Sequence, residues 1–337
     1  MVQYIAVLKL LKIAEDRRMV TEFTMELLPL SFFLYILKNC IKNMLMLICP
    51  NLIIRLKQPT GTGDLHIDRD LTASVKYSQD VFEKYFRFLA VKDIPAFLNG
   101  KTVIEIGPGN TVTVAFLFLA YGAKRVFCFD RFPLVQDMQK NKLIAIRLLE
   151  ILPDTQRECL SKIISFNAKG TIQWDSTHLY YLHNKRKLIA IQDETVDLVV
   201  SNAVLEHVSD LEELFREMAR TMKPGAVMVH AADLGPHQLD IRTPLDFLTI
   251  PEWLWKIMTS HRGAPNRARK SQYEMLLRKY FFEILRFKVT EHFTQTDIDI
   301  ITAKVPQLRE TVSEEDISCR SILFSARKLE MGHSRGM

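Results

Sequence analysis

The first pattern in this chain that could do chemistry is a carboxylate followed by a glycine turn. The apolar run Val103–Ile106 contains Glu105, and Gly107, Pro108 and Gly109 follow it directly. Glycine has no Cβ, so Gly107 and Gly109 can adopt positive φ and let a ligand approach the backbone closely. Nucleotide-like ligands bind at such a turn, where a parallel strand ends and a helix begins. The pattern therefore predicts a nucleotide-type site.

Two further segments follow in the order that such a site requires. Arg125–Asp130 is typical of a buried strand, and its terminal carboxylate, Asp130, lies about one βαβ unit after the glycines. A carboxylate at that point can accept hydrogen bonds from both hydroxyls of an adenosine ribose. Val196–Val208 then runs from a strand through the polar turn at Asn202 into a helix. Side chains that contact a substrate commonly lie at such a turn.

These three segments resemble the class I S-adenosylmethionine (SAM)-dependent methyltransferases, in particular the methyltransferase type 11 group. The resemblance covers roughly residues 72–328 and implies SAM as the cofactor. It implies the following contacts: Glu105, Gly107, Pro108 and Gly109 with the methionine part of SAM, Asp130 with the ribose, Arg131 with the adenine, and Asn202 and Ala203 near the methyl donor. Asp175 would meet the adenine amino group if Trp174 ended the third strand.

Two other functions stay open at this point. The motif of a nicotinamide-dependent oxidoreductase has a third glycine at the position of Val112, and it does not include a carboxylate at the position of Glu105. A non-catalytic SAM-binding module would keep Glu105 and Asp130 and lack an acceptor pocket. The chain also departs from the methyltransferase pattern, because Thr111 stands where a third glycine is common.

Three residues are the candidate catalytic groups. Methyl transfer to a hydroxyl requires removal of its proton, and histidine is the usual base. His207 follows the Asn202 turn, and Asp233 and His237 form a second pair after the fifth strand. The alternatives are a local hydrogen bond for His207 and a turn-capping role for Asp233. In quinone O-methyltransferases a pair similar to Glu206 and His207 helps to bind a divalent metal. A further carboxylate, three residues before the glutamate, completes that site. That position is Ala203 here, so we expect no metal site.

The elements that position these residues alternate between strand and helix, which predicts an α/β fold. We expect a doubly wound, mostly parallel, seven-stranded sheet with an antiparallel final strand at 317–326. Helices are expected at 72–90, with Tyr77 reaching SAM, at 113–121 and at 137–151. Ser209–Glu212 is a capping box that starts the next helix. The third strand is either 162–166 or 171–174, with 180–188 as an insertion.

Three regions are predicted along the chain. Residues 1–65 form an apolar helical arm and linker, residues 66–330 form the methyltransferase domain, and residues 240–285 form a basic helical lid within it. The apolar runs of the arm are too short to cross a bilayer. Residues 27–57 therefore lie on a membrane surface, with Lys38, Lys42, Arg55 and Lys57 toward the headgroups, or dock on the domain or on the second subunit of a homodimer.

Charge and cysteine content bear on the partner and the compartment. The formal net charge is +6, and residues 256–288 hold nine Lys or Arg against two Glu. This segment either captures an anionic acceptor or is a solvated basic face. No nucleic-acid module accompanies it, so a nucleic-acid substrate is not expected. Five scattered cysteines without a CxxC pair favour free thiols in the cytoplasm, with or without membrane association.

The sequence thus predicts a SAM-dependent methyltransferase that acts on oxygen. By analogy with similar proteins of bacterial surface-polysaccharide synthesis, its acceptor is an anionic small molecule, a saccharide or a lipid-linked molecule.

Overall fold

The computed structural model describes residues 30–50, 52–53 and 70–330, with gaps at 133, 136, 184–187, 238, 240–242, 307 and 309–311. The expectations for residues 1–29, for the linker and for Arg55 and Lys57 lie outside the described residues.

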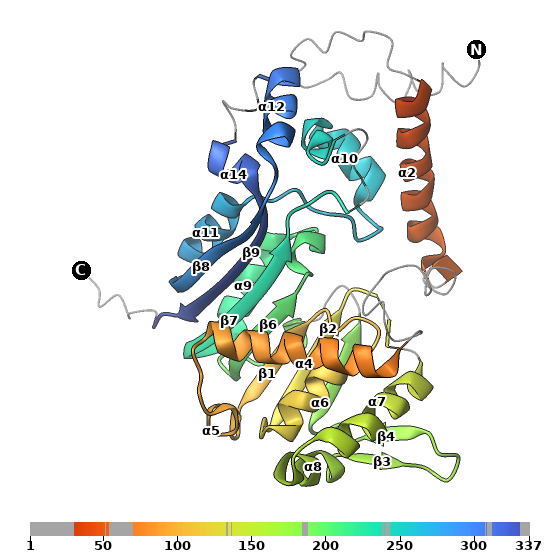
Figure 1. Cartoon of the computed structure of the whole chain (residues 1–337), viewed down its shortest axis with the longest axis vertical. Coiled ribbons are helices and arrows are strands. Elements are labelled where there is room, and N and C mark those ends of the chain that lie inside the picture. Colours follow the sequence, from red (N-terminus) through yellow and green to blue (C-terminus); the bar gives the residue numbers. More distant parts are fainter. Residues whose placement is uncertain are drawn as a thin grey trace.

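A seven-stranded sheet forms the centre of the protein, in the order β5-β2-β1-β6-β7-β9-β8 (Figure 1). The first five strands of this order are parallel, β9 is antiparallel to β7, and β8 is antiparallel to β9. This confirms the predicted doubly wound sheet and its antiparallel final strand. The bounds are β1 Thr102–Ile106, β2 Arg125–Asp130, β5 Leu179–His183, β6 Val196–Asn202, β7 Met222–Asp233, β8 Phe282–His292 and β9 Cys319–Lys328.

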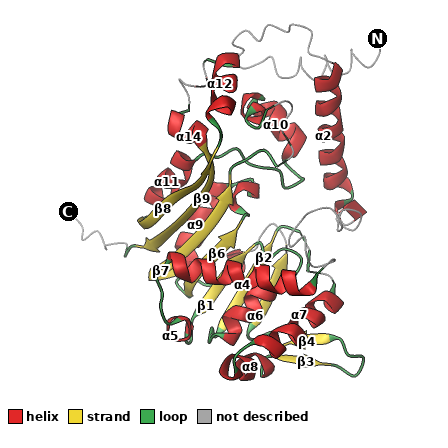
Figure 2. Ribbon diagram, viewed as in Figure 1, coloured by secondary structure: helices red, strands yellow, loops and turns green. Residues whose placement is uncertain are grey.

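Helices cover both faces of this sheet (Figure 2). Successive side chains of a strand point to opposite faces, so Val103 and Ile104 of β1 enter different hydrophobic cores. The core around Val103 is closed by α4 (Leu71–Phe88), α6 (Thr113–Ala120), α7 (Met138–Ile151) and α8 (Asp154–Ser161). The core around Ile104 is closed by α9 (Leu211–Thr221) and α11 (Lys270–Lys279). A short helix, α5 (Ile94–Leu98), precedes β1.

The helix predicted at 72–90 is α4, and its sequence explains why it forms there. The Asp70 side chain accepts hydrogen bonds from the amides of Thr72 and Ala73, which caps the first turn. Apolar residues recur at helical spacing along the predicted stripe, and Phe82 packs edge-on against Phe118 of α6 at 5.2 Å between ring centroids. The stripe packs α4 into the core around Val103.

Both candidates for the third strand were wrong. β3 (Ile164–Phe166) and β4 (Ile172–Trp174) pair antiparallel with each other and form a separate hairpin. The turn between them explains this, because Asn167 Oδ1 accepts from the amides of Lys169 and Thr171, and Gly170 has a φ of +69°. The third parallel strand is β5, from the segment interpreted as an insertion.

The predicted lid at 240–285 is not one unit. Residues of α11 pack on the sheet, and β8 begins at Phe282. The earlier part, η3 (Asp246–Thr249) and α10 (Glu252–Thr259), shares a third core with α2 (Leu30–Ile48), α12 (Gln295–Lys304) and α14 (Glu314–Ser318). We call these five elements the cap. The helix expected to start with a capping box at Ser209 is α9, and Asp210 caps it instead by accepting from the Glu213 amide.

No helix within the described residues has both the length and the apolar character needed to cross a membrane. All five cysteines are free thiols.

Candidate active site

The glycine turn after β1 has the predicted conformation. Gly107 and Gly109 have φ values of +71° and +76°. A Cβ at Gly107 would lie 2.8 Å or less from both Cγ atoms of Val204, in the turn after β6. The Gly107 amide also donates to the Phe129 carbonyl of β2 at 2.6 Å. Glycine is therefore required here both by the backbone and by the close approach of the β6 turn.

Glu105 provides a buried carboxyl group beside this turn. It is 5% exposed, and the Cys128 thiol donates to its Oε2 at 3.5 Å. Burial raises the pKa of Glu105 to about 8, and the charge of Asp130 adds to this against the effect of the thiol. A buried carboxyl with so little compensation is suited to a cationic group. The ammonium of the methionine part of SAM is such a group, so the residues present fit this cofactor.

Asp130 ends β2 at the same edge of the sheet. Its Oδ1 accepts from the Phe132 amide at 2.9 Å, which fixes the carboxylate at the turn. Parallel strands end at one edge, so Asp130 lies in register with His183 at the end of β5. This is the position expected for a residue that binds the ribose.

The turn after β6 is fixed by α4. Asn202 donates to the Tyr77 hydroxyl at 3.2 Å, and Lys84 donates to the Asn202 side-chain oxygen. Ala203 has a φ of +55°, an unusual conformation for a residue with a Cβ, and its amide donates to the Ala231 carbonyl at 2.9 Å. Tyr77 and Asn202, which were selected separately, thus lie side by side, and their contact with SAM stays a prediction.

Asp175 does not reach this edge of the sheet. It lies in the turn that precedes the amino end of β5, where its Oδ1 accepts from the Thr177 amide at 2.7 Å. The expectation of an adenine contact required Trp174 to end the third strand, and Trp174 ends β4 of the separate hairpin instead. His183, which the sequence analysis did not select, stands at the end of β5.

The candidate catalytic residues come together around one buried glutamate. Glu206 and His207 lie in η2 (Leu205–His207), and His237 follows β7. Glu206 Oε1 lies 4.0 Å from His207 Nε2 and 3.9 Å from His237 Nε2, and the two imidazole centroids are 4.7 Å apart. Asp233 supplies its amide to Glu206 Oε1 at 3.2 Å and its carbonyl to His237 Nε2 at 3.0 Å. The sequence indicated His207 and the Asp233–His237 pair separately, and Glu206 joins them.

Burial dominates the electrostatics of this cluster. It raises the pKa of Glu206 to about 8, although hydrogen bonds from backbone amides oppose the rise. Burial lowers the pKa of His207 to about 4, and the neighbouring His237 lowers it further. Glu206 Oε2 has no hydrogen-bond partner among the described residues. His237 has a φ of +47°, so this cluster also contains a strained backbone position.

These same three side chains are the ones that could hold a metal. Ligand atoms of Glu206, His207 and His237 lie within 4.8 Å of one another. The expectation of no metal site depended on Ala203, and His237, in the loop after β7, offers a third ligand atom.

A loop of the cap lies over the site, and we call residues 260–267 the capping loop. At one end, Arg131 donates to the Ser260 carbonyl at 2.7 Å. At the other end, the Asn266 amide donates to the Glu206 carbonyl at 2.6 Å. Between them, the Gly263 backbone lies near the His207 ring and opposes the fall in the pKa of His207. The loop therefore joins the end of β2 to the turn after β6. Arg131, which was expected beside the adenine, is one of its supports.

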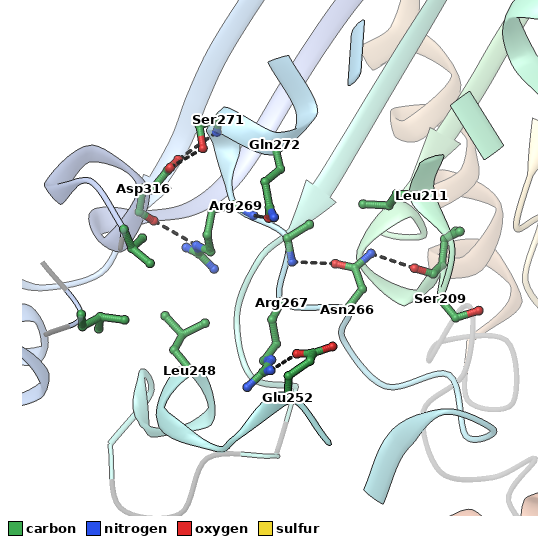
Figure 3. Close-up of a pocket in the computed structure, with 14 residues that line it drawn as sticks. Ser209, Leu211, Leu248, Glu252, Asn266, Arg267, Arg269, Ser271, Gln272 and Asp316 are labelled. Atoms are coloured by element: carbon green, nitrogen blue, oxygen red, sulfur yellow. Dashed lines mark hydrogen bonds and ion pairs between the residues drawn. The ribbon is translucent and has the colours of Figure 1, made fainter. Parts of the chain in front are cut away.

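The basic residues around this loop are mostly engaged in the fold. Arg269 is 4% exposed and donates to the carbonyls of Leu234, Asp316 and Cys319. Arg267 pairs with Glu252, as Figure 3 shows. These arginines line a cavity of about 480 Å³ behind the loop. Arg267 and Arg269 are therefore not part of a solvated basic face, because their buried guanidinium groups are held by carbonyl groups and by Glu252. The expectation of an anionic acceptor stays a prediction.

Comparison with known protein families agrees with this geometry. Residues 77–286 match the methyltransferase domain family, and the chain belongs to it. It is a SAM-dependent methyltransferase, and the nicotinamide-dependent alternative is excluded. Comparison with curated proteins gives no match.

Several solved structures are similar in fold. Phosphoethanolamine N-methyltransferase 2 of Haemonchus contortus, in complex with SAM, is 14% identical, with a TM-score of 0.38 over 69% of this chain. This chain spans 49% of that protein's length. A SAM-dependent methyltransferase of Mesorhizobium loti is 19% identical over 68% of this chain and 92% of its own, with a TM-score of 0.38. A putative sarcosine dimethylglycine methyltransferase of Galdieria sulphuraria is 16% identical over 80% and 92%, with a TM-score of 0.43.

Proposed function

We propose that this methyltransferase transfers the methyl group of SAM to a hydroxyl oxygen. The observation that carries the proposal is the pair of imidazoles, His207 and His237, held beside the buried Glu206. SAM supplies an already activated methyl group, so the protein has to align the acceptor and accept its proton. Two imidazoles at the rim of the site suit a hydroxyl acceptor, because its proton must leave as the oxygen is methylated.

Within this pair, His237 is the proposed base. Its Nε2 lies 3.0 Å from the Asp233 carbonyl, which favours a proton on Nε2 and leaves Nδ1 to accept one. Glu206 Oε1 lies 3.9 Å from Nε2, so a positive charge on the ring favours ionisation of the Glu206 carboxyl, and the ionised carboxylate then stabilises the charged ring. His207 has a pKa of about 4, too low for an efficient base at neutral pH, and we assign it to orienting the hydroxyl.

We further propose that the acceptor is an anionic small molecule, saccharide or lipid-linked molecule. Arg262 of the capping loop supports this, because it donates to the uncharged side chain of Asn39 and is adjacent to Gly263, whose backbone lies near the His207 ring. The run Val196–Val208 supports membership in the type 11 group. The five free thiols support residence in the cytoplasm.

The test is transfer of label from [methyl-³H]SAM to fractionated cell extract. We expect label in an alkali-stable methyl ether that anion-exchange resin retains, and at least a hundredfold less with the His237→Ala protein. Label in a methylamine would show that the acceptor atom is nitrogen and would overturn the proposal. A methyl ether that the resin does not retain would contradict only the proposal that the acceptor is anionic.

A further inference from the structure

Helix α2 packs on the rest of the cap through a side that contains two buried asparagines. Asn39 and Asn43 are 4% and 5% exposed, and Met46 is buried beside them. Asn43 Nδ2 donates to the Ile257 carbonyl at 2.8 Å and to the Ser260 hydroxyl at 3.1 Å, and its Oδ1 accepts from the His261 amide at 2.7 Å. A helix of a globular domain normally buries an apolar stripe and exposes polar residues. In α2 the polar side chains anchor the inner side.

The outer side of α2 is apolar and exposed. We define the apolar face as Leu34, Leu37, Ile41, Met44, Leu45 and Ile48, which recur at spacings of three and four residues. Their exposed fractions run from 39% for Leu45 to 65% for Ile48. On the adjoining α10, Trp253 and Ile257 are 46% and 54% exposed. Large apolar surfaces of this kind mark an interaction site.

We propose that the apolar face binds a lipid surface that carries anionic headgroups. Lys38 and Lys42 border the face on one side, and α2 contains no acidic residue. This combination of a long apolar stripe with lysines at its edge is typical of helices that lie in the plane of a membrane interface. The helix does not meet the requirements for crossing a bilayer, in agreement with that orientation.

A second copy of the chain fits the same face less well. A twofold contact between two antiparallel α2 helices would bring their lysine-bearing edges together, with no carboxylate on either helix to pair with Lys38 and Lys42. Lysine is also depleted in protein–protein interfaces. An anionic lipid surface offers the opposite charge. This inference is independent of the methyl acceptor.

The experiment is sedimentation of the full chain with vesicles of phosphatidylcholine alone or with 30% phosphatidylglycerol. We expect binding to the anionic vesicles at least tenfold tighter than to the neutral ones, with the difference reduced by added salt. The Ile41→Glu/Leu45→Glu protein should lose at least tenfold in vesicle affinity. Met275→Glu, at an apolar residue of α11 that is 56% exposed, is the matched control and should bind as the unchanged chain does.

Calorimetry with SAM shows whether each variant is folded, since the apolar face lies apart from the glycine turn. A Lys38→Gln protein should keep binding to neutral vesicles and lose part of its preference for anionic ones. Absence of vesicle binding by the unchanged chain would overturn the proposal. If sedimentation velocity showed a dimer of the unchanged chain, and the Ile41→Glu/Leu45→Glu protein were monomeric, the proposal would be overturned. The apolar face would then bind a second copy of the chain.

Discussion

Asn43 accepts a hydrogen bond of 2.7 Å from the backbone amide of His261, so an asparagine of α2 fixes the first turn of the capping loop. The other end of this loop is fixed by the bond from the Asn266 amide to the Glu206 carbonyl. The helix that carries the apolar face and the turn that carries the candidate catalytic residues are therefore connected through one short loop.

Replacing Asn43 with Ala should loosen the capping loop. The change removes the Asn43 hydrogen bonds of the part-buried His261 amide and Ile257 carbonyl, so the free energy of unfolding should fall by about 1–3 kcal/mol. Hydrogen exchange at the His261 amide should become faster than in the unchanged protein, with the amides of β1 as the internal reference. Gln295→Ala, on the exposed side of α12, is the control and should change neither quantity. Unchanged exchange at His261 would show that other contacts hold the loop.

Replacing Gly107 with Ala should abolish SAM binding and lower stability. The new methyl would occupy the space of the Val204 side chain, and φ at this position is +71°. Gly100→Ala separates the two effects, because Gly100 has a φ of +72° and no atom within 4 Å of the point that a Cβ would occupy. Gly100→Ala should cost about 1 kcal/mol from backbone strain alone, and Gly107→Ala clearly more. If urea unfolding showed equal losses of unfolding free energy for Gly100→Ala and Gly107→Ala, the contact with Val204 would not be important for stability.

Replacing Asp130 with Ala should weaken SAM binding by about 10- to 100-fold, the range expected when hydrogen bonds to a charged group are lost. Titration calorimetry with SAM and S-adenosylhomocysteine measures the change, which should be equal for both ligands because they share the ribose. Asp80→Ala, on the exposed side of α4, is the control. An unchanged dissociation constant for Asp130→Ala would remove this residue from the cofactor site.

Replacing His237 with Ala should reduce kcat by about 10²–10⁴-fold, the usual contribution of a general base, and leave SAM affinity nearly unchanged. His207→Ala should affect KM for the acceptor more than kcat, because His207 is assigned to orienting the hydroxyl. Steady-state kinetics with the identified acceptor separates the two roles. Normal turnover by both variants would show that neither histidine takes the proton.

The stability of the ligand-free protein should fall as pH rises from 6.5 to 8. The pKa of Glu206 is about 8 in the folded state, above the value near 4.5 that it takes when unfolded. In this window the unfolded chain has lost the proton that the folded chain retains, so raising the pH favours unfolding. Each such group contributes a slope of about 1.4 kcal/mol per pH unit, and Glu105 adds to it.

Urea unfolding at several pH values checks this, and Glu206→Gln should make the slope shallower. His207, with a folded pKa of about 4, has the opposite effect, because the unfolded chain binds a proton there below pH 6.5. Measurements above pH 6.5 avoid its contribution. A slope unaffected by Glu206→Gln would mean that Glu206 is ionised in the folded protein.

The sequence predicted those features that depend on local pattern. The sequence showed the strand that contains Glu105, the glycines after it and the strand that ends at Asp130. These features were recognisable because a buried strand and a tight turn each restrict residue type locally. β5 was missed because Leu179–His183 alternates only weakly, and the turn at Asn167 and Gly170 decides which segments pair.

The catalytic cluster could be predicted only in parts. His207 and His237 lie on different strand ends, and their meeting depends on β6 and β7 being neighbours in the sheet. Arg269 illustrates a second limit, since its position in a basic run suggested a surface charge. Only the fold shows the three carbonyl groups that surround it.

The cofactor-binding edge and the capping loop are supported by different hydrophobic cores, so the two parts of the site can change independently in evolution. Glu105 and the glycine turn rest on the two cores of the sheet, whereas the capping loop extends from the third core, within the cap. Substitutions in the cap can thus alter which acceptor is admitted while the cofactor-binding edge keeps its geometry. Relatives that share the glycine turn and differ in the cap would be expected to methylate different molecules.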